Sequence, residues 1–137
     1  MFKKLMLPID LAHAARMERA VQAAVDLARL YDCPVTLVGV TAETATSVAH
    51  NPTEYAARLA QFGADLAGQH GVTVDTAAYT AHDPSIDLDK TILAAARETG
   101  CDLIVMASHV PGIPEHFFAS HVGAVASHAT VSVFVVR

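Results

Sequence analysis

Three points in the chain place polar side chains beside apolar segments. Asp10 and Ser108 each follow an apolar run of strand length, and Ser120-His121 precede a segment whose apolar residues recur at helical spacing. Carboxylate, hydroxyl and imidazole groups can bind the polar parts of a small ligand. A helix start adds free backbone amides and the positive end of a dipole, both of which suit phosphate. This residue set could therefore bind a small ligand that carries a phosphate.

Metal binding by histidines is one alternative chemistry for this chain. His121 and His128 stand seven residues apart on a predicted helix, so they share a face but lie two turns apart. No pair stands at i, i+4 with the glutamate of an HExxH motif. We therefore favour solvated histidines over a metal site for the four in the last third, His109, His116, His121 and His128.

Hydrolysis is another alternative chemistry. Ser108 and His109 could form a triad with Asp10 or Asp83, but a triad needs a geometry that sequence alone cannot supply. The chain has no G-x-S-x-G elbow, no P-loop and no dinucleotide-binding glycine fingerprint. We therefore expect no dedicated enzyme, and at most a slow ATPase.

The elements that must position these residues follow from apolar patterning. Short apolar runs predict strands at 5–9, 35–40, 72–79, 102–107 and 131–136. Helical spacing predicts helices at 12–31, 52–70, 88–99 and 122–129, with 80–87 as a loop. This alternation predicts one Rossmann-like α/β domain over 1–137, a five-stranded parallel doubly wound sheet with helices on both faces. Ligands of such sheets bind beyond the carboxyl ends of strands, here the first and fourth.

Composition limits the classes of partner. The 137 residues carry a formal net charge of −5, and the nine basic residues are scattered along the sequence. This argues against nucleic acid and anionic membranes as partners, since both require clustered Lys and Arg. Cys33 and Cys101 form no CxxC pair, and we interpret them as strand-proximal buried thiols. No signal peptide or membrane-length apolar run is visible, so we expect a cytoplasmic protein.

Several motifs, spread over the whole chain, resemble those of a known protein family. Pro8-Ile9-Asp10, the strand Asp102–Met106, the helix Val122–Ala129 and the terminal strand Val133–Val136 stand in one order and spacing. In these features the chain resembles the universal stress protein family. Ala107-Ser108-His109, with a proline two residues on, resembles the branch often labelled universal stress protein F or G.

The resemblance implies a phosphate-binding motif that this chain keeps only in spacing. Nucleotide-binding members carry Gly-x-x-Gly, nine residues, then Gly-Ser or Gly-Thr. Here the glycines are replaced by Ala107, Val110 and Ser120, and His121 stands in the last position. Glycine permits close backbone approach to phosphate, and the final hydroxyl is a donor. Ser120 could supply that hydroxyl one residue early, and a protonated His121 could contact phosphate.

The resemblance also implies the remaining site, cofactor and partner predictions. The ligand would be ATP or another adenine nucleotide, with Mg as a possible companion. Asp10 would accept a hydrogen bond from ribose or adenine or, alternatively, cap a helix; Val40 would line the adenine pocket or be plain core. The predicted binding residues are Pro8, Ile9, Asp10, Val40, Met106, Ala107, Ser108, His109, Val110, Ser120, His121 and Val122.

Assembly and function leave two main hypotheses open. The terminal strand 131–136 is apolar and nearly uncharged, which predicts a homodimer formed through this edge. One hypothesis is a nucleotide-responsive stress regulator that also contacts an unknown regulatory protein. The other is a dimeric interaction module of the same fold that has lost nucleotide binding. Phe117-Phe118 could be a lid over the cleft or an interface patch, although burial against the fourth helix is the simpler interpretation.

Overall fold

A five-stranded, all-parallel sheet with the strand order β3-β2-β1-β4-β5 forms the centre of the molecule. This is a computed structural model, and it describes residues 1–108 and 118–137. Leu5 of β1 stands opposite Val35 on one side and Leu103 on the other. The strands are β1 Leu5–Pro8, β2 Val35–Ala42, β3 Val74–Ala81, β4 Leu103–Ala107 and β5 Ser132–Val136.

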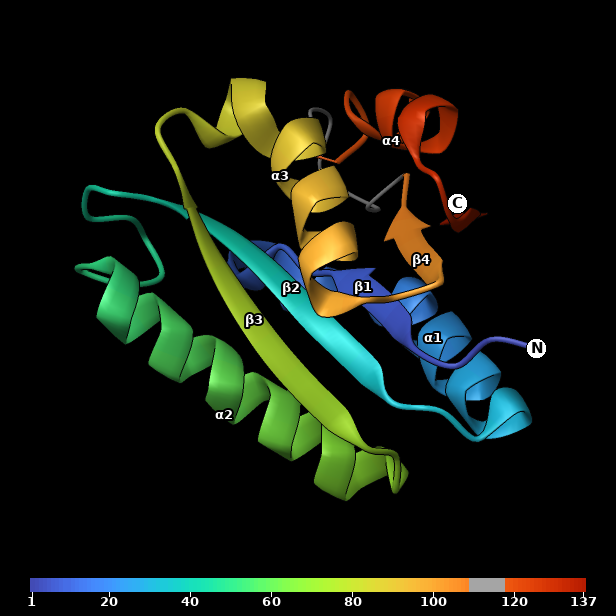
Figure 1. Cartoon of the computed structure of the whole chain (residues 1–137). Helices are drawn as coiled ribbons and strands as arrows, with labels where there is room; N and C mark the ends of the chain where they lie inside the picture. The colour runs from blue at the N-terminus through green and yellow to red at the C-terminus, as the bar shows by residue number, and fades with distance from the viewer. Residues whose placement is uncertain (109–117) are drawn as a thin grey trace.

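Helices cover both faces of this sheet. Helix α2 packs on β2 and β3 from one side and α3 packs on them from the other (Figure 1). Helix α1 contacts β1 and β4 and shares a groove with α2, whereas α4 contacts α3 and β5. The bounds are α1 Glu18–Tyr31, α2 Pro52–His70, α3 Pro84–Thr99 and α4 Val122–His128, and a short 3-10 helix, η1, spans Leu11–Arg16.

The predicted fold class is confirmed, and two predicted helices need correction. The segment 12–31 is divided, because η1 ends at Arg16 and α1 begins at Glu18. Helix α3 begins at Pro84, inside the stretch 80–87 that the sequence pattern assigned to a loop. Asp83 caps it, since its side chain accepts a hydrogen bond from the Ser85 N–H, and Pro84 suits the first helical position.

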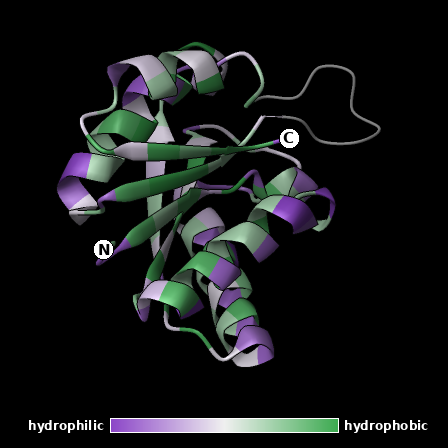
Figure 2. Cartoon of the chain, turned by 90° about the vertical axis from the view of Figure 1, so that its right-hand side faces the viewer, coloured by the Kyte–Doolittle hydropathy of each residue, from purple (hydrophilic) through white to green (hydrophobic). Residues whose placement is uncertain are grey.

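The core is aliphatic and rich in alanine, as the composition requires. The central strands are hydrophobic, whereas polar residues gather on the outer helices (Figure 2). Small residues let the helices approach the sheet closely. A Cβ atom at Gly63 of α2 would lie 2.6 Å from Cγ2 of Thr76 on β3, so this position has room only for glycine. Among the described residues, no helix is long and apolar enough to span a membrane.

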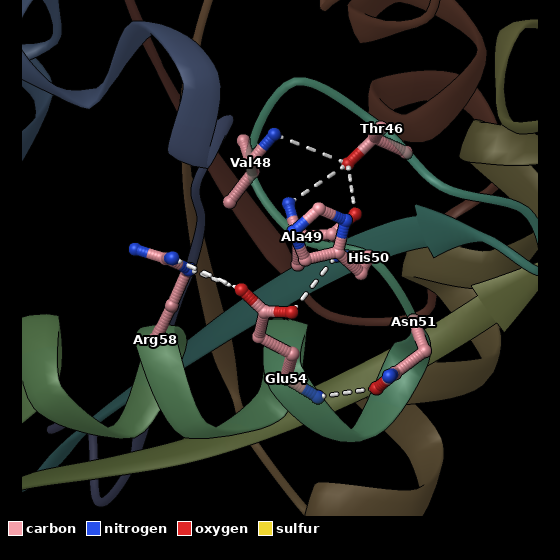
Figure 3. A network of polar contacts seen from close by, with 7 residues as sticks. All are labelled: Thr46, Val48, Ala49, His50, Asn51, Glu54 and Arg58. Carbon is pink, nitrogen blue, oxygen red and sulfur yellow. Dashed lines mark hydrogen bonds and ion pairs between the residues drawn. The ribbon is translucent and has the colours of Figure 1, made fainter.

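Side-chain hydrogen bonds fix the connection between β2 and α2 (Figure 3). The Thr46 hydroxyl accepts bonds from the N–H groups of Val48 and Ala49, at 3.2 and 3.3 Å. Asn51 caps α2 by accepting a 2.8 Å bond from the Glu54 N–H, and the Glu54 carboxylate accepts a 3.0 Å bond from the His50 N–H. This reciprocal arrangement is a form of capping box, and it holds the loop at the carboxyl end of β2.

Candidate functional site

The candidate site lies where the strand order reverses, at the carboxyl ends of β1 and β4. From β1 the chain proceeds outward to β2 and β3 on one side, and β4 and β5 lie on the other. Parallel α/β sheets form ligand crevices at such a switch point. The structure therefore places Pro8-Ile9-Asp10 and Ala107-Ser108 at the same edge of the sheet.

Asp10 is held by its neighbours at this edge. Its side chain is only 14% exposed, and Oδ2 lies 2.7 Å from Nδ1 of His13 in η1. The preceding Ile9 N–H donates a 2.9 Å bond to the Val38 carbonyl, which continues the β1–β2 pairing to the residue before Asp10. The carboxylate is thus positioned by the strand end on one side and by η1 on the other. Asp10 directly precedes η1. In the described part of the chain, its side chain makes no capping hydrogen bond to a backbone N–H of that helix.

The cavity beside Asp10 is nearly filled by Phe118. It measures about 20 Å³ and is lined on the α3 side of the sheet. Phe118 is 2% exposed and packs into the core cluster. Phe118 therefore lines this cavity together with Val40, the residue that the resemblance assigns to the adenine pocket. The lining residues are Pro8, Ile9, Asp10, Val38, Val40, Leu88, Ile92 and Phe118.

Phe118 also occupies the start of α4 through its backbone. Its carbonyl accepts bonds from the N–H groups of His121 and Val122, both at 3.0 Å. These amides lie in the turn where the family motif would place phosphate. Their use by Phe118 leaves fewer free donors at this helix start than the sequence predicts. Ser120, the predicted hydroxyl donor, is exposed.

The His121 ring is directed toward α3. Nδ1 lies 2.9 Å from Oδ1 of Asp89, and Nε2 lies 2.8 Å from the carbonyl oxygen of Ser85. A carbonyl oxygen only accepts, so Nε2 donates to Ser85. The ring donates in both contacts when both nitrogens are protonated. Its side chain is 11% exposed, so His121 joins α4 to α3 in this structure.

Among the described residues at the end of β4, none lines the cavity beside Asp10. Met106 is fully buried in the core, and Ala107 lines a separate cavity on the α1 side of the sheet. The Ser108 hydroxyl donates a 3.1 Å bond to the Val136 carbonyl, which also accepts a 2.8 Å bond from the Ser108 N–H. His109 and Val110 lie outside the described residues.

Tyr55 is a neighbour of the site that the sequence argument missed. It comes from α2, is 4% exposed, and lies directly against Gly39 of β2. Burial, with a smaller contribution from the Asp10 carboxylate, raises the pKa of the Tyr55 phenol well above its usual range. The phenol is therefore neutral at physiological pH. The isolated glycine within the strand pattern was the available signal, since it often marks a close approach.

The two cysteines are free thiols that differ in burial. Cys101 is buried just before β4, and Cys33 is half-buried after α1. Burial raises the pKa of both thiols, which favours the protonated form over the nucleophilic thiolate. Neither cysteine lines the cavity beside Asp10.

Comparison with known proteins decides the family. The model of the universal stress protein family matches residues 1–137, the whole chain. The chain belongs to the universal stress protein family. No curated protein matches the sequence.

Solved structures of this family share the fold at low sequence identity. A universal stress protein from Archaeoglobus fulgidus has a TM-score of 0.71 and 17% identity, with 100% of each chain covered. The Archaeoglobus fulgidus protein in complex with dAMP gives 0.71 and 17%, with 98% of each chain covered. A family protein from Arabidopsis thaliana with AMP bound gives 0.67 and 16%, covering 98% of this chain and 90% of the other. The universal stress protein described here thus has the fold of relatives that bind adenine nucleotides.

Proposed function

We propose that this universal stress protein is a cytoplasmic stress-response module that binds ATP, ADP or AMP at the carboxyl ends of β1 and β4. The observation that carries the proposal is the position of Asp10, a positioned carboxylate beside an apolar cavity at the switch point. Such a carboxylate can accept from ribose hydroxyls or from the adenine amino group. Pro8 and Val40 form apolar walls that suit a flat base.

The phosphate end would rest on the segment before α4 and on the loop after β4. Ser120 offers an exposed hydroxyl. The Ser108 and Val122 amides donate to the Val136 and Phe118 carbonyls in this structure, so they would have to exchange those partners for phosphate. His109, Val110 and His121 complete the predicted set. When bound, the nucleotide would supply a charged phosphate chain, with Mg as its counterion where ATP is the ligand. The chain's own residues would bind and orient that ligand.

Phe118 sets a condition on this proposal. The cavity of about 20 Å³ is far smaller than ligand pockets, which measure roughly 300–1,000 Å³. A nucleotide can enter only if the Phe118 ring leaves the space beside Asp10. Exposing a buried phenylalanine costs about 1.5–3 kcal/mol, which corresponds to about 10- to 150-fold in apparent affinity.

We further propose that β5 pairs with its two-fold mate to form a homodimer. β5 is the last strand of the sheet order, and its Phe134 and Val135 are 47% and 42% exposed. An edge strand with apolar side chains is open to pairing with another chain, and a two-fold contact is self-complementary. Nucleotide binding would then change the contacts that this dimer makes with a regulatory protein partner.

A second candidate function is an interaction module that no longer binds nucleotide. Two observations favour it: the cavity beside Asp10, which Phe118 lines, measures only about 20 Å³, and the His121 ring is bound to Asp89 and Ser85. Under this alternative the filled cleft is a permanent part of the core, and Phe118 contributes stability alone.

Calorimetric titration with ATP, ADP, AMP and cyclic AMP tests the proposal. We expect saturable binding of at least one nucleotide to the wild type. Asp10→Ala should weaken it by about 1–3 kcal/mol, the cost of leaving a buried hydrogen-bond partner unsatisfied. Asp26→Ala removes an exposed carboxylate of α1 and serves as the matched control. Equal affinities for the wild type and Asp10→Ala would remove Asp10 from the site.

A further inference from the structure

The fold gathers arginines that are scattered in the sequence. Arg16 and Arg19 flank the start of α1, and Arg137 follows the last residue of β5. All three line one cavity of about 340 Å³. Half of the six arginines in a chain of net charge −5 therefore stand around a single opening.

These arginines are not engaged elsewhere. Within the described residues, none of the three guanidinium groups makes a hydrogen bond or an ion pair, in contrast to those of Arg29 and Arg58. Glu18 is the one carboxylate side chain that lines the cavity, and in the same part of the chain it forms no ion pair with them. The described side chains that line the cavity thus contribute three positive charges and one negative charge.

The floor of this cavity is apolar. Met17 is 2% exposed, Ala20 is 1% and Ala107 is 3%, and each of them lines it. A guanidinium binds phosphate oxygens through two parallel N–H donors, and an apolar floor favours a ligand with an organic body. The volume lies in the range of small-molecule pockets, which favours a small ligand. α1 begins without a side-chain cap, so its first amides add to the positive potential.

We propose that this cavity binds a small organic phosphate through Arg16, Arg19 and Arg137. The site is separate from the cleft beside Asp10, because it is lined by α1 on one face of the sheet, whereas Phe118, Leu88 and Ile92 line the cleft on the other. It stands independently of the proposed nucleotide function. Its place beyond the ends of β4 and β5 would let the bound anion reach the edge where the second copy is expected.

Titration with phenyl phosphate, followed by calorimetry or by amide chemical shifts, tests this site. Inorganic phosphate is the parallel probe, and we expect it to bind more weakly because it cannot use the apolar floor. Arg16→Gln and Arg19→Gln should each weaken phenyl phosphate binding about tenfold, the scale of one charge-assisted hydrogen bond. Arg29→Gln removes one charge at the other end of α1 and should leave the affinity unchanged.

Three outcomes would overturn the assignment. The first is no saturable binding of phenyl phosphate by the folded wild type. The second is an equal loss in Arg16→Gln and Arg29→Gln, which would show general charge attraction. The third is loss of phenyl phosphate binding in Asp10→Ala, which would place the probe in the nucleotide cleft. Retained phenyl phosphate binding in a variant that lacks nucleotide binding would support this site even where the proposed function fails.

Discussion

Nδ1 of His121 lies 2.9 Å from Oδ1 of Asp89, across the contact between α4 and α3. The pair stands at the position where the family motif carries a small residue, and it joins the short α4 to a long neighbour. Nε2 of the same ring donates to the Ser85 carbonyl one turn earlier in α3. One side chain therefore fixes the start of α4 against two points of α3.

From this contact we predict a coupled loss of stability. His121→Ala and Asp89→Ala should each lower the free energy of unfolding by about 1–3 kcal/mol, because each leaves a partly buried polar partner unsatisfied. Urea denaturation of the two single variants and the double variant measures the coupling, which we expect to be about 0.5–3 kcal/mol. His128→Ala is the control, since that ring contacts only the Ala124 carbonyl of its own helix among the described hydrogen bonds. Additive losses would contradict a direct contact.

The capping box of α2 gives a prediction about pH. The hydrogen bond from the His50 N–H lowers the pKa of Glu54 below its usual range, and the hydrogen bond from the Arg58 side chain makes a smaller contribution in the same direction. A carboxyl whose folded pKa is depressed stabilises the fold above its unfolded pKa, and this stability is lost as pH falls through the folded pKa. Thermal melts from pH 6 to pH 3 should therefore show a smaller acid-induced loss in Glu54→Gln than in the wild type. Parallel curves would show that Glu54 has no such role.

The cap itself is expected to matter at neutral pH. Asn51→Ala removes the acceptor of the Glu54 N–H and should lower stability by about 1 kcal/mol, whereas Asn51→Ser should retain most of it. Urea midpoints at pH 7 compare the two variants. A serine variant as unstable as the alanine variant would show that the side-chain bond is unimportant.

Gly39 provides a test of the Tyr55 contact. A Cβ atom at residue 39 would lie 2.4 Å from the Tyr55 hydroxyl oxygen and 2.9 Å from its Cε1. Gly39→Ala should therefore destabilise the protein by about 1–3 kcal/mol through overpacking. Gly68→Ala is the matched control, because a Cβ there meets nothing within 4 Å and alanine favours the helix. Equal stability of Gly39→Ala and the wild type would contradict the close packing.

The proposed dimer is tested at the exposed side chain in the middle of β5. Phe134→Lys should convert a dimer to a monomer, since two-fold pairing would bring like charges close together. Ile86→Lys places the same charge on α3, where the side chain is 66% exposed, and should leave the assembly unchanged. Sedimentation velocity distinguishes the two states. A wild type that is monomeric at high micromolar concentration would contradict the dimer.

The sequence predicts the frame of this molecule well, because buried parallel strands leave a strong signal. The runs that became β1 and β4 are continuous and apolar, and Gly71 and Gly100 end α2 and α3 in the left-handed region at φ 66° and 69°. The sequence pattern predicts the start of α3 too late in the chain. Asp83-Pro84 is typical of a loop, but here Asp83 caps the helix and Pro84 is its first residue. The local sequence at 80–87 is compatible with either a loop or a helix start, and tertiary packing decides between the two.

The candidate site was less predictable, because its contacts join residues distant in sequence. Asp10 lines the cavity at the end of β1, and its role in ligand binding stays a prediction. The position of Phe118 beside that cavity and the bond from His121 to Asp89 depend on how α3 and α4 pack. The convergence of Arg16 and Arg137 likewise depends on β5 joining β4. No spacing rule relates such positions.

The affinity of ATP for Phe118→Ala, compared with the wild type in one calorimetric series, tests the central claim most directly. Removing the ring opens the space beside Asp10 and eliminates the cost of displacing it. We predict that Phe118→Ala binds ATP about tenfold or more tightly than the wild type, from about 1.5–3 kcal/mol of burial. Phe62→Ala, which alters a half-buried phenylalanine of α2, should not change the affinity. A folded Phe118→Ala variant, verified by circular dichroism, that binds ATP no better than the wild type would contradict the account.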